Sequence, residues 1–169
     1  MQEDTDFYRF EKFSRVTKND GALAGYPTAS LFSSTANAAV EGWYDRMGMS
    51  ESKVFYCFDG QTPFTSALLN VRYMFSRTDS EDPNLYTLIG EQDGVYLYKC
   101  NYTLPAGFVL TDGQNLSSSE LEASSSDPLE LQNQMAYSLG AASPLFVPVI
   151  SSETDDATSF TAEKEGHYY

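Results

Sequence analysis

Few side chains in this sequence stand at the spacings that catalysis or metal binding requires. Two cysteines and one histidine, Cys57, Cys100 and His167, are too few for a four-ligand zinc site. The pair 155–156 lacks the spacing and central glycine of a calcium-binding loop, so we interpret it as solvated charge. The sequence contains no phosphate-binding glycine-rich loop, His-Glu-x-x-His or Gly-x-Ser-x-Gly pattern. We therefore expect no catalytic residue, no metal and no cofactor in this chain.

The two cysteines allow two interpretations. Each lies in an aromatic, strand-like run, at residues 54–58 and 95–100. Such a position is typical of a buried free thiol. The alternative is a disulfide between Cys57 and Cys100, which would form in an oxidising compartment. The sequence leaves both interpretations open.

The basic residues near the start of the chain recur at every third position, at Arg9, Lys12, Arg15 and Lys18. In a strand this spacing places them on alternating faces, so they form no continuous basic stripe. Our first interpretation is ion pairing with the surplus carboxylates. Recognition of an anionic lipid phosphate is the second.

Aromatic side chains make up 14% of the chain, with twelve tyrosines and eleven phenylalanines. At this density they are typical of a buried core. Stacking on sugar rings is the second interpretation. The residues considered for stacking are Tyr8, Tyr26, Tyr44, Tyr73, Tyr96, Tyr98 and Trp43.

Periodicity and turn residues predict the elements that must position these side chains. Thr62 and Asp127 are each followed by proline, the N-cap and first-turn pattern of a helix. A further helix is predicted after the possible caps Ser33, Ser34 and Thr35. Helices are expected over residues 36–47, 63–68 and 128–139, and strands over 7–16, 71–76, 86–90, 95–99, 106–110 and 145–150.

Turn signals separate these elements and indicate how they connect. Residues 19–21 (Asn-Asp-Gly) predict a turn, and residues 92–94 (Gln-Asp-Gly) predict a hairpin with antiparallel strands. Interspersed strands and helices predict an α+β fold, with a mixed, largely antiparallel sheet and helices packed on one face. We expect residues 1–110 to form the core, 111–127 an acidic Ser-rich loop or linker, and 128–169 a helix plus terminal strands that complete the domain.

Length and charge exclude several classes of protein. The 169 residues fit one domain, and the net charge of −14 repels nucleic acids and anionic lipid surfaces. Residues 1–110 carry −5 of this charge and residues 111–169 carry −9. No run approaches the roughly 18 apolar residues that span a bilayer. The polar start and abrupt aromatic end lead us to expect a piece of a longer protein.

Several segments together resemble one known family, the extracytoplasmic region of the bacterial YfhO-like membrane proteins. The resemblance covers about residues 7–150, and its most specific parts are LLNVRYM and the later YLY and LPAGF. The Ser-rich stretch after Gly113 departs from the pattern, and Cys100 stands where relatives are expected to carry a polar residue. The matching segments are FYRFEK (7–12), KNDG (18–21), GYP (25–27), FSSTAN (32–37), TPFTSALLNVRYM (62–74), DGVYLY (93–98) and LPAGF (104–108).

The resemblance implies a multi-pass protein similar to lipid-phosphate-sugar-dependent glycosyltransferases. It also implies a Gram-positive-type envelope and the decoration of polymers such as teichoic acid. The expected partners are the transmembrane portion of the same polypeptide and an envelope glycopolymer, and the expected location is the extracytoplasmic face of the cell membrane. Because the family's catalytic carboxylates are expected near the membrane-embedded part, we expect no activity from this domain alone. Whether the parent protein is an enzyme stays open.

The function expected from the resemblance is that of an accessory domain that binds the acceptor or shapes the active site. The alternative is a non-catalytic protein-interaction or structural module of the cell envelope. The loop-rich stretch between residues 19 and 37 supplies the expected contacts, with a hydrogen-bonded loop and helix cap as their other interpretation. These residues are Asn19, Asp20, Tyr26, Ser33, Ser34, Thr35 and Asn37.

Overall fold

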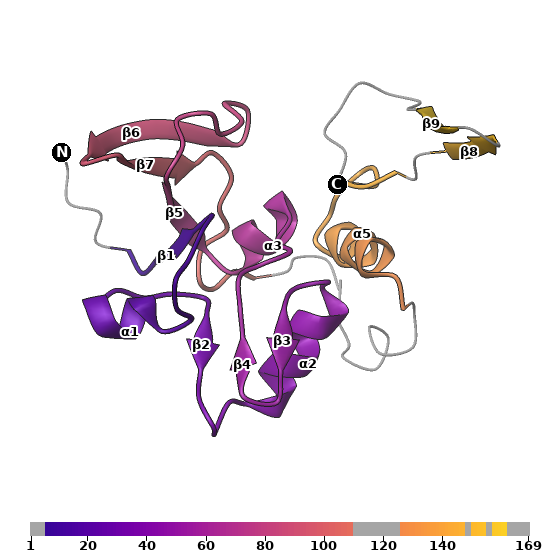
Figure 1. The fold of residues 1–169 in the computed structure, drawn as a ribbon. Helices are drawn as coiled ribbons and strands as arrows, with labels where there is room; N and C mark the ends of the chain where they lie inside the picture. The colour runs from indigo at the N-terminus through magenta and orange to yellow at the C-terminus, as the bar shows by residue number, and fades with distance from the viewer. Residues whose placement is uncertain (1–5, 110–125, 148–149, 155–156, 162–169) are drawn as a thin grey trace.

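The structure is a computed structural model that describes residues 6–109, 126–147, 150–154 and 157–161 (Figure 1). Helices are interspersed among strands that pair mostly antiparallel, so the predicted α+β class is confirmed. The helices are α1 (Asp20–Ala24), α2 (Ala38–Arg46), α3 (Pro63–Leu68) and α5 (Pro128–Ser138). The strands are β1 (Arg9–Lys12), β2 (Leu31–Phe32), β3 (Glu51–Ser52), β4 (Phe55–Tyr56), β5 (Val71–Ser76), β6 (Tyr86–Gln92), β7 (Val95–Cys100), β8 (Ile150–Thr154) and β9 (Ala157–Thr161).

The main sheet has four strands in the order β1-β5-β7-β6. β1 runs parallel to β5, and the other two pairings are antiparallel. The predicted mixed, largely antiparallel sheet is therefore confirmed. The small sheet has the order β2-β4-β3, with α2 packed against β3 and β4, while α3 packs against β5 (Figure 1). β8 and β9 pair with each other.

Local capping signals explain where the helices begin. Thr62 accepts a hydrogen bond from the Thr65 amide and the Thr65 hydroxyl accepts one from the Thr62 amide, so α3 has a complete capping box. Asp127 caps α5 by accepting hydrogen bonds from the amides of residues 129 and 130. Both helices start at the predicted proline. α2 is capped by Asn37 rather than by residues 33–35, since the Asn37 side chain accepts from the Ala39 amide.

Other predictions differ from the structure at particular residues. Residues 19–21 do not form a simple turn, because α1 begins at Asp20. The helix ends at Ala24 and is capped by Gly25, which adopts the left-handed conformation at φ 75°. β1 spans four residues instead of the predicted ten, since only these pair with β5. Residues 106–109 and 145–147 are not strands, and β8 starts at Ile150.

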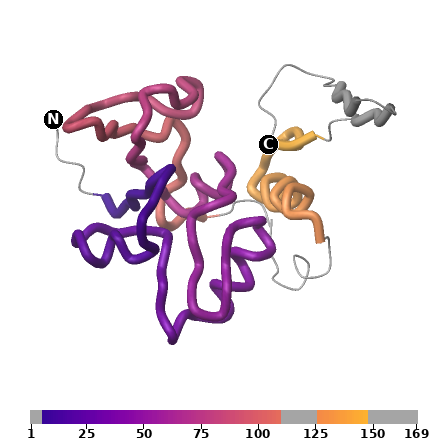
Figure 2. Tube along the Cα trace, viewed as in Figure 1, coloured from indigo at the N-terminus to yellow at the C-terminus, as the bar shows by residue number. Residues whose placement is uncertain are grey.

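One apolar core joins elements that lie far apart in the sequence. Between the sheets and helices lie side chains from β5, β7, α2 and α5, so α5 belongs to the same core as the first hundred residues. Figure 2 shows α5 returning beside the segment that contains α3. The buried members are Ala29, Tyr44, Met47, Met49, Phe58, Val71, Met74, Tyr98, Cys100, Leu131 and Met135.

Polar bonds and close backbone contacts fix α5 on this core. The fully buried Gln132 accepts from the Thr62 hydroxyl at 2.5 Å and donates to the Met47 carbonyl at 3.0 Å. Gly48 and Gly60 both have positive φ, and a Cβ at Gly60 would lie 2.5 Å from the Gly48 carbonyl oxygen. Only glycine therefore allows these two loops to meet beneath the start of α5.

Candidate functional site: the outer aromatic face of the main sheet

The two faces of the main sheet differ because side chains alternate along each strand. On β5, Met74 points into the core beside Tyr98, its partner on β7. Its neighbours Tyr73 and Phe75 point to the other face, where Phe75 is opposite Leu97. Aromatic side chains from β1, from the residue before it and from the loop after α1 join them there. We call these five half-buried residues the outer aromatic face: Tyr8, Phe10, Tyr26, Tyr73 and Phe75.

The rings of the outer aromatic face form a continuous cluster centred on Phe10. Phe10 stacks on Tyr73 with ring centroids 5.1 Å apart and on Phe75 with centroids 5.6 Å apart. Tyr8 and Tyr26 meet Phe10 edge-on at 5.5 and 5.7 Å. Such pairs stabilise the cluster by about 0.5–1.5 kcal/mol each beyond the area they bury. The rings are thereby held in fixed orientations before any ligand arrives.

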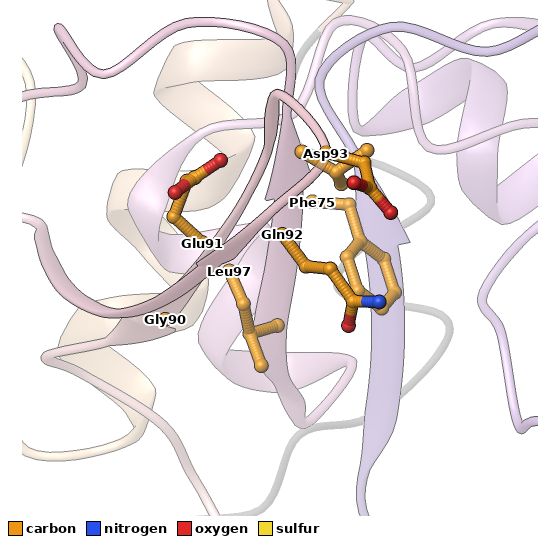
Figure 3. Close-up of a pocket in the computed structure, with 7 residues that line it drawn as sticks. Phe75, Gly90, Glu91, Gln92, Asp93 and Leu97 are labelled. Atoms are coloured by element: carbon orange, nitrogen blue, oxygen red, sulfur yellow. The ribbon is translucent and has the colours of Figure 1, made fainter.

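Two adjoining hollows lie along this face and share Phe75 and Val95. The first, of about 490 Å³, is formed with the β6–β7 hairpin (Figure 3). In Figure 3 the Gln92 side chain extends toward the Phe75 ring, whereas Glu91 points away. The second, of about 330 Å³, is lined by Tyr26, Lys12 and Arg77 among others. Together the two hollows combine the Phe75 and Tyr26 rings with polar and charged groups, and such a mixture is typical of a binding cleft.

Lys12 is the positioned charge at this rim. Its ammonium group lies 2.8 Å from Asp20, whose other oxygen accepts from the Thr17 hydroxyl at 2.6 Å. Burial acts to lower the pKa of Lys12, but the Asp20 hydrogen bond and the nearby Tyr26 outweigh it, so the pKa is raised. The hydrogen bonds from Lys12 and Thr17 lower the pKa of Asp20. Lys12 is therefore cationic at neutral pH and is held in place beside Tyr26.

A buried polar node lies on the other face of β1 and was missed by sequence reasoning. Glu11 is only 3% exposed, and its Oε1 accepts from Thr28, the Ala29 amide and the Ser30 hydroxyl. Arg15 lies 3.4 Å from Glu11. Simple alternation along β1 gave no signal for this burial, because the donors come from residues 28–30.

Arg15 connects this node to the small sheet. It lies 3.1 Å from Asp59 and donates to the Cys57 sulfur at 3.0 Å and the Phe58 carbonyl at 3.2 Å. The interpretation of the early basic residues as ion-pair partners is confirmed for Lys12 and Arg15. Lys18 instead lies over the Phe55 ring, 4.3 Å from its centroid. The node therefore organises the fold beneath the outer aromatic face.

Both cysteines are buried free thiols in the structure. Burial raises the pKa of Cys57, and a hydrogen bond to Asp59 raises it further. Burial alone raises the pKa of Cys100 to about 12. Neither thiol is poised to act as a nucleophile, since nucleophilic cysteines have lowered pKa values.

Of the seven contacts expected from the sequence, only Tyr26 lines the outer aromatic face. Asn19 bridges to β2, donating to the Phe32 carbonyl at 2.9 Å and accepting from the Phe32 amide at 2.8 Å. Asp20 holds Lys12, and Asn37 caps α2. Three residues lie in the turn before α2: Ser33 and Thr35, whose hydroxyls are 3.1 Å apart, and exposed Ser34.

The residues considered for sugar stacking divide between the core and the surface. Tyr44 and Tyr98 are buried in the core, where the Tyr44 hydroxyl donates to the Ala29 carbonyl. Trp43 and Tyr96 pack against that core. The remaining three belong to the outer aromatic face, namely Tyr8, Tyr26 and Tyr73.

Comparison with protein-family models matches residues 1–165 to the family described as bacterial membrane protein YfhO. The chain therefore belongs to this family of bacterial membrane proteins. No curated protein and no solved structure matches the chain. Among the described helices, none has the length and apolar composition needed to cross a membrane.

Proposed function

We propose that this domain binds the glycopolymer acceptor of a multi-pass membrane glycosyltransferase, on the extracytoplasmic face of the cell membrane. The transmembrane portion belongs to the same polypeptide. The family membership supports attachment to a membrane protein. The observation that carries acceptor binding is the outer aromatic face with its two adjoining hollows.

The geometry of this face suits a chain of sugar rings. The C–H groups of a sugar pack on the electron-rich face of an aromatic ring, and Phe75 stands between the two hollows. Gln92 and Asp93 on one side, with Lys12 and Arg77 on the other, offer donors and acceptors to hydroxyl groups. The domain supplies binding and orientation, and the catalytic carboxylates belong to the membrane-embedded part.

Glycan binding by the 169-residue chain tests this proposal. We expect envelope polysaccharide to bind the unmodified chain, and Tyr26→Ala to weaken binding about tenfold, the loss of one stacking contact of about 1.4 kcal/mol. The matched control is Tyr102→Ala, which removes an exposed tyrosine outside the face. If both variants bound the glycan as tightly as the unmodified chain, the outer aromatic face would not be the acceptor site.

Protein docking is the second candidate, and the edge strand β6 favours it. Leu88 and Ile89 on this strand are exposed, and among the described strands β6 pairs only with β7. An exposed edge can accept a strand from a partner. A register shift between Leu88 and Gly90 interrupts the edge and shortens the length that could pair. For that reason we place this function second.

A further inference from the structure

A second surface, separate from the outer aromatic face, carries no charge at all. It is made by residues 101–109, which follow β7, and residues 141–147, which follow α5. We call it the uncharged loop face. In a chain with 34 charged residues, none lies between positions 100 and 111 or between positions 131 and 152. Two such gaps meet in space here, so this surface has no charged residue of its own although the molecule is acidic.

Large apolar side chains are exposed on both loops of this face. Tyr102 is 63% exposed and Val109 88%, and Leu145 on the other loop is 48% exposed. The loops meet at a hollow of about 370 Å³, where Tyr102 and Leu145 line the wall together with Phe64 of α3 and Phe146. None of the described residues that line this hollow is charged.

Hydrogen bonds fix this face at Leu145 and Phe146 on one loop and beside Tyr102 on the other. The Asn133 side chain accepts from the Leu145 and Phe146 amides, both at 2.9 Å, and donates to the Phe146 carbonyl at 2.8 Å. Asn101 donates to the carbonyls of Pro83 at 3.1 Å and Asn84 at 3.0 Å, beside Tyr102. Ligand binding therefore would not have to order these loops first.

We propose that the uncharged loop face rests on the lipid bilayer and sets the domain's orientation to the membrane. When this face is buried at the membrane interface, none of its own residues has a charge to remove from water. Burying an acidic surface would instead cost the hydration free energy of its carboxylates. Tyrosine with aliphatic neighbours is the composition that prefers the headgroup boundary. Because the chain belongs to a family of membrane proteins, we expect a bilayer to lie close to this domain.

A second copy of the chain is a weaker occupant for the same surface. Two molecules that each carry a net charge of −14 repel one another, while a zwitterionic bilayer imposes no such repulsion. The bilayer proposal is also independent of glycan binding, because the outer aromatic face and the uncharged loop face share no residue.

Depth-dependent fluorescence quenching tests the proposal with phosphatidylcholine vesicles that carry brominated acyl chains. A Tyr102→Trp variant places a reporter on the uncharged loop face. The matched variant Leu23→Trp places one on α1, where Leu23 is 80% exposed. We expect bromolipid to quench the Tyr102→Trp variant and to leave Leu23→Trp at the level of the native Trp43 background.

Substitution on the face should remove binding without unfolding the chain. We expect Leu145→Asp to lower the vesicle-bound fraction about tenfold, because the leucine side chain would no longer be there to be buried in the bilayer. Val16→Asp, at a fully exposed position elsewhere, should leave it unchanged, and circular dichroism should show both variants folded. Glycan binding by Leu145→Asp should match that of the unmodified chain, which separates this proposal from acceptor binding.

Three outcomes would overturn the proposal. The first is no quenching of Tyr102→Trp at millimolar lipid, and the second is equal quenching of Tyr102→Trp and Leu23→Trp. The third is a dimer in sedimentation equilibrium that Leu145→Asp dissociates, since the face would then be covered by a second copy.

Discussion

The two faces of the main sheet are built from the same strands and from similar residues, yet they differ in what covers them. Met74 and Tyr98 on the inner face are sealed by helices. Phe75 and Tyr73 on the outer face contact other aromatic rings, and Phe75 also lines two hollows. Aromatic content alone therefore does not separate core from binding surface. The presence of a covering layer does.

The largest effect is expected from removing the buried polar node on the inner face of the sheet. We expect Glu11→Ala to destabilise the chain by about 3–5 kcal/mol, because Arg15 would lose its buried carboxylate partner and keep only the exposed Asp59. Denaturant unfolding followed by circular dichroism measures the change. A loss below about 1 kcal/mol would show that Asp59 and water replace Glu11 around Arg15.

Two substitutions at adjacent residues of β5 test directly how the two faces of the sheet differ. Met74→Ala should cost about 2–5 kcal/mol of unfolding free energy by leaving a cavity, with glycan affinity unchanged in the folded fraction. Phe75→Ala should cost roughly half as much, because Phe75 is half-buried, and should weaken glycan binding about tenfold. Unfolding curves and glycan titrations measure the two effects. If Met74→Ala weakened glycan binding and Phe75→Ala did not, the glycan site would not be the outer aromatic face.

High pH probes the inner face through Cys100. Burial raises its pKa from 9.0 to about 12, so the unfolded chain loses this proton first. Stability is then fully present below about pH 9 and falls as pH rises toward 12. Unfolding at pH 8, 9 and 10 should show a smaller decline in Cys100→Ala than in the unmodified chain. Parallel declines would mean that Cys100 ionises freely in the folded state.

The smallest effect is expected at the rim of the outer face. Lys12→Met removes the ion pair with Asp20, and because both groups are partly exposed the cost should stay at about 0.3–1 kcal/mol. Glycan affinity should fall when measured at low salt and change little at high salt. A stability loss like that of Met74→Ala would instead make Lys12 part of the core.

Predictions from the sequence succeeded where the determining residues are neighbours in the chain. The starts of α3 and α5 follow from one cap residue and one proline, and the β6–β7 hairpin from Asp93-Gly94. The burial of Glu11 could not be predicted, because its donors come from residues 28–30. The parallel pairing of β1 with β5 likewise joins segments about sixty residues apart.

The residues of the candidate site could be predicted only to the same extent. Tyr8, Tyr26 and Tyr73 were recognisable as stacking residues by type, but periodicity could not show that Tyr44 and Tyr98 are covered. Asn37 was expected as a contact and proves to cap α2, because hydrogen-bonding side chains serve caps and ligands equally well. Phe10 and Phe75 were missed as site residues, since an alternating strand does not show which face lacks a covering layer.

The bonds of Gln132 have a consequence for how the chain can be divided. Because this buried amide joins α5 to residues 47 and 62, the two parts of the domain are held together without the chain that links them. We expect a single peptide-bond cut between residues 110 and 125 to leave a stable two-piece complex. The same position would then serve for splitting the domain into fragments that reassemble, or for inserting a reporter protein.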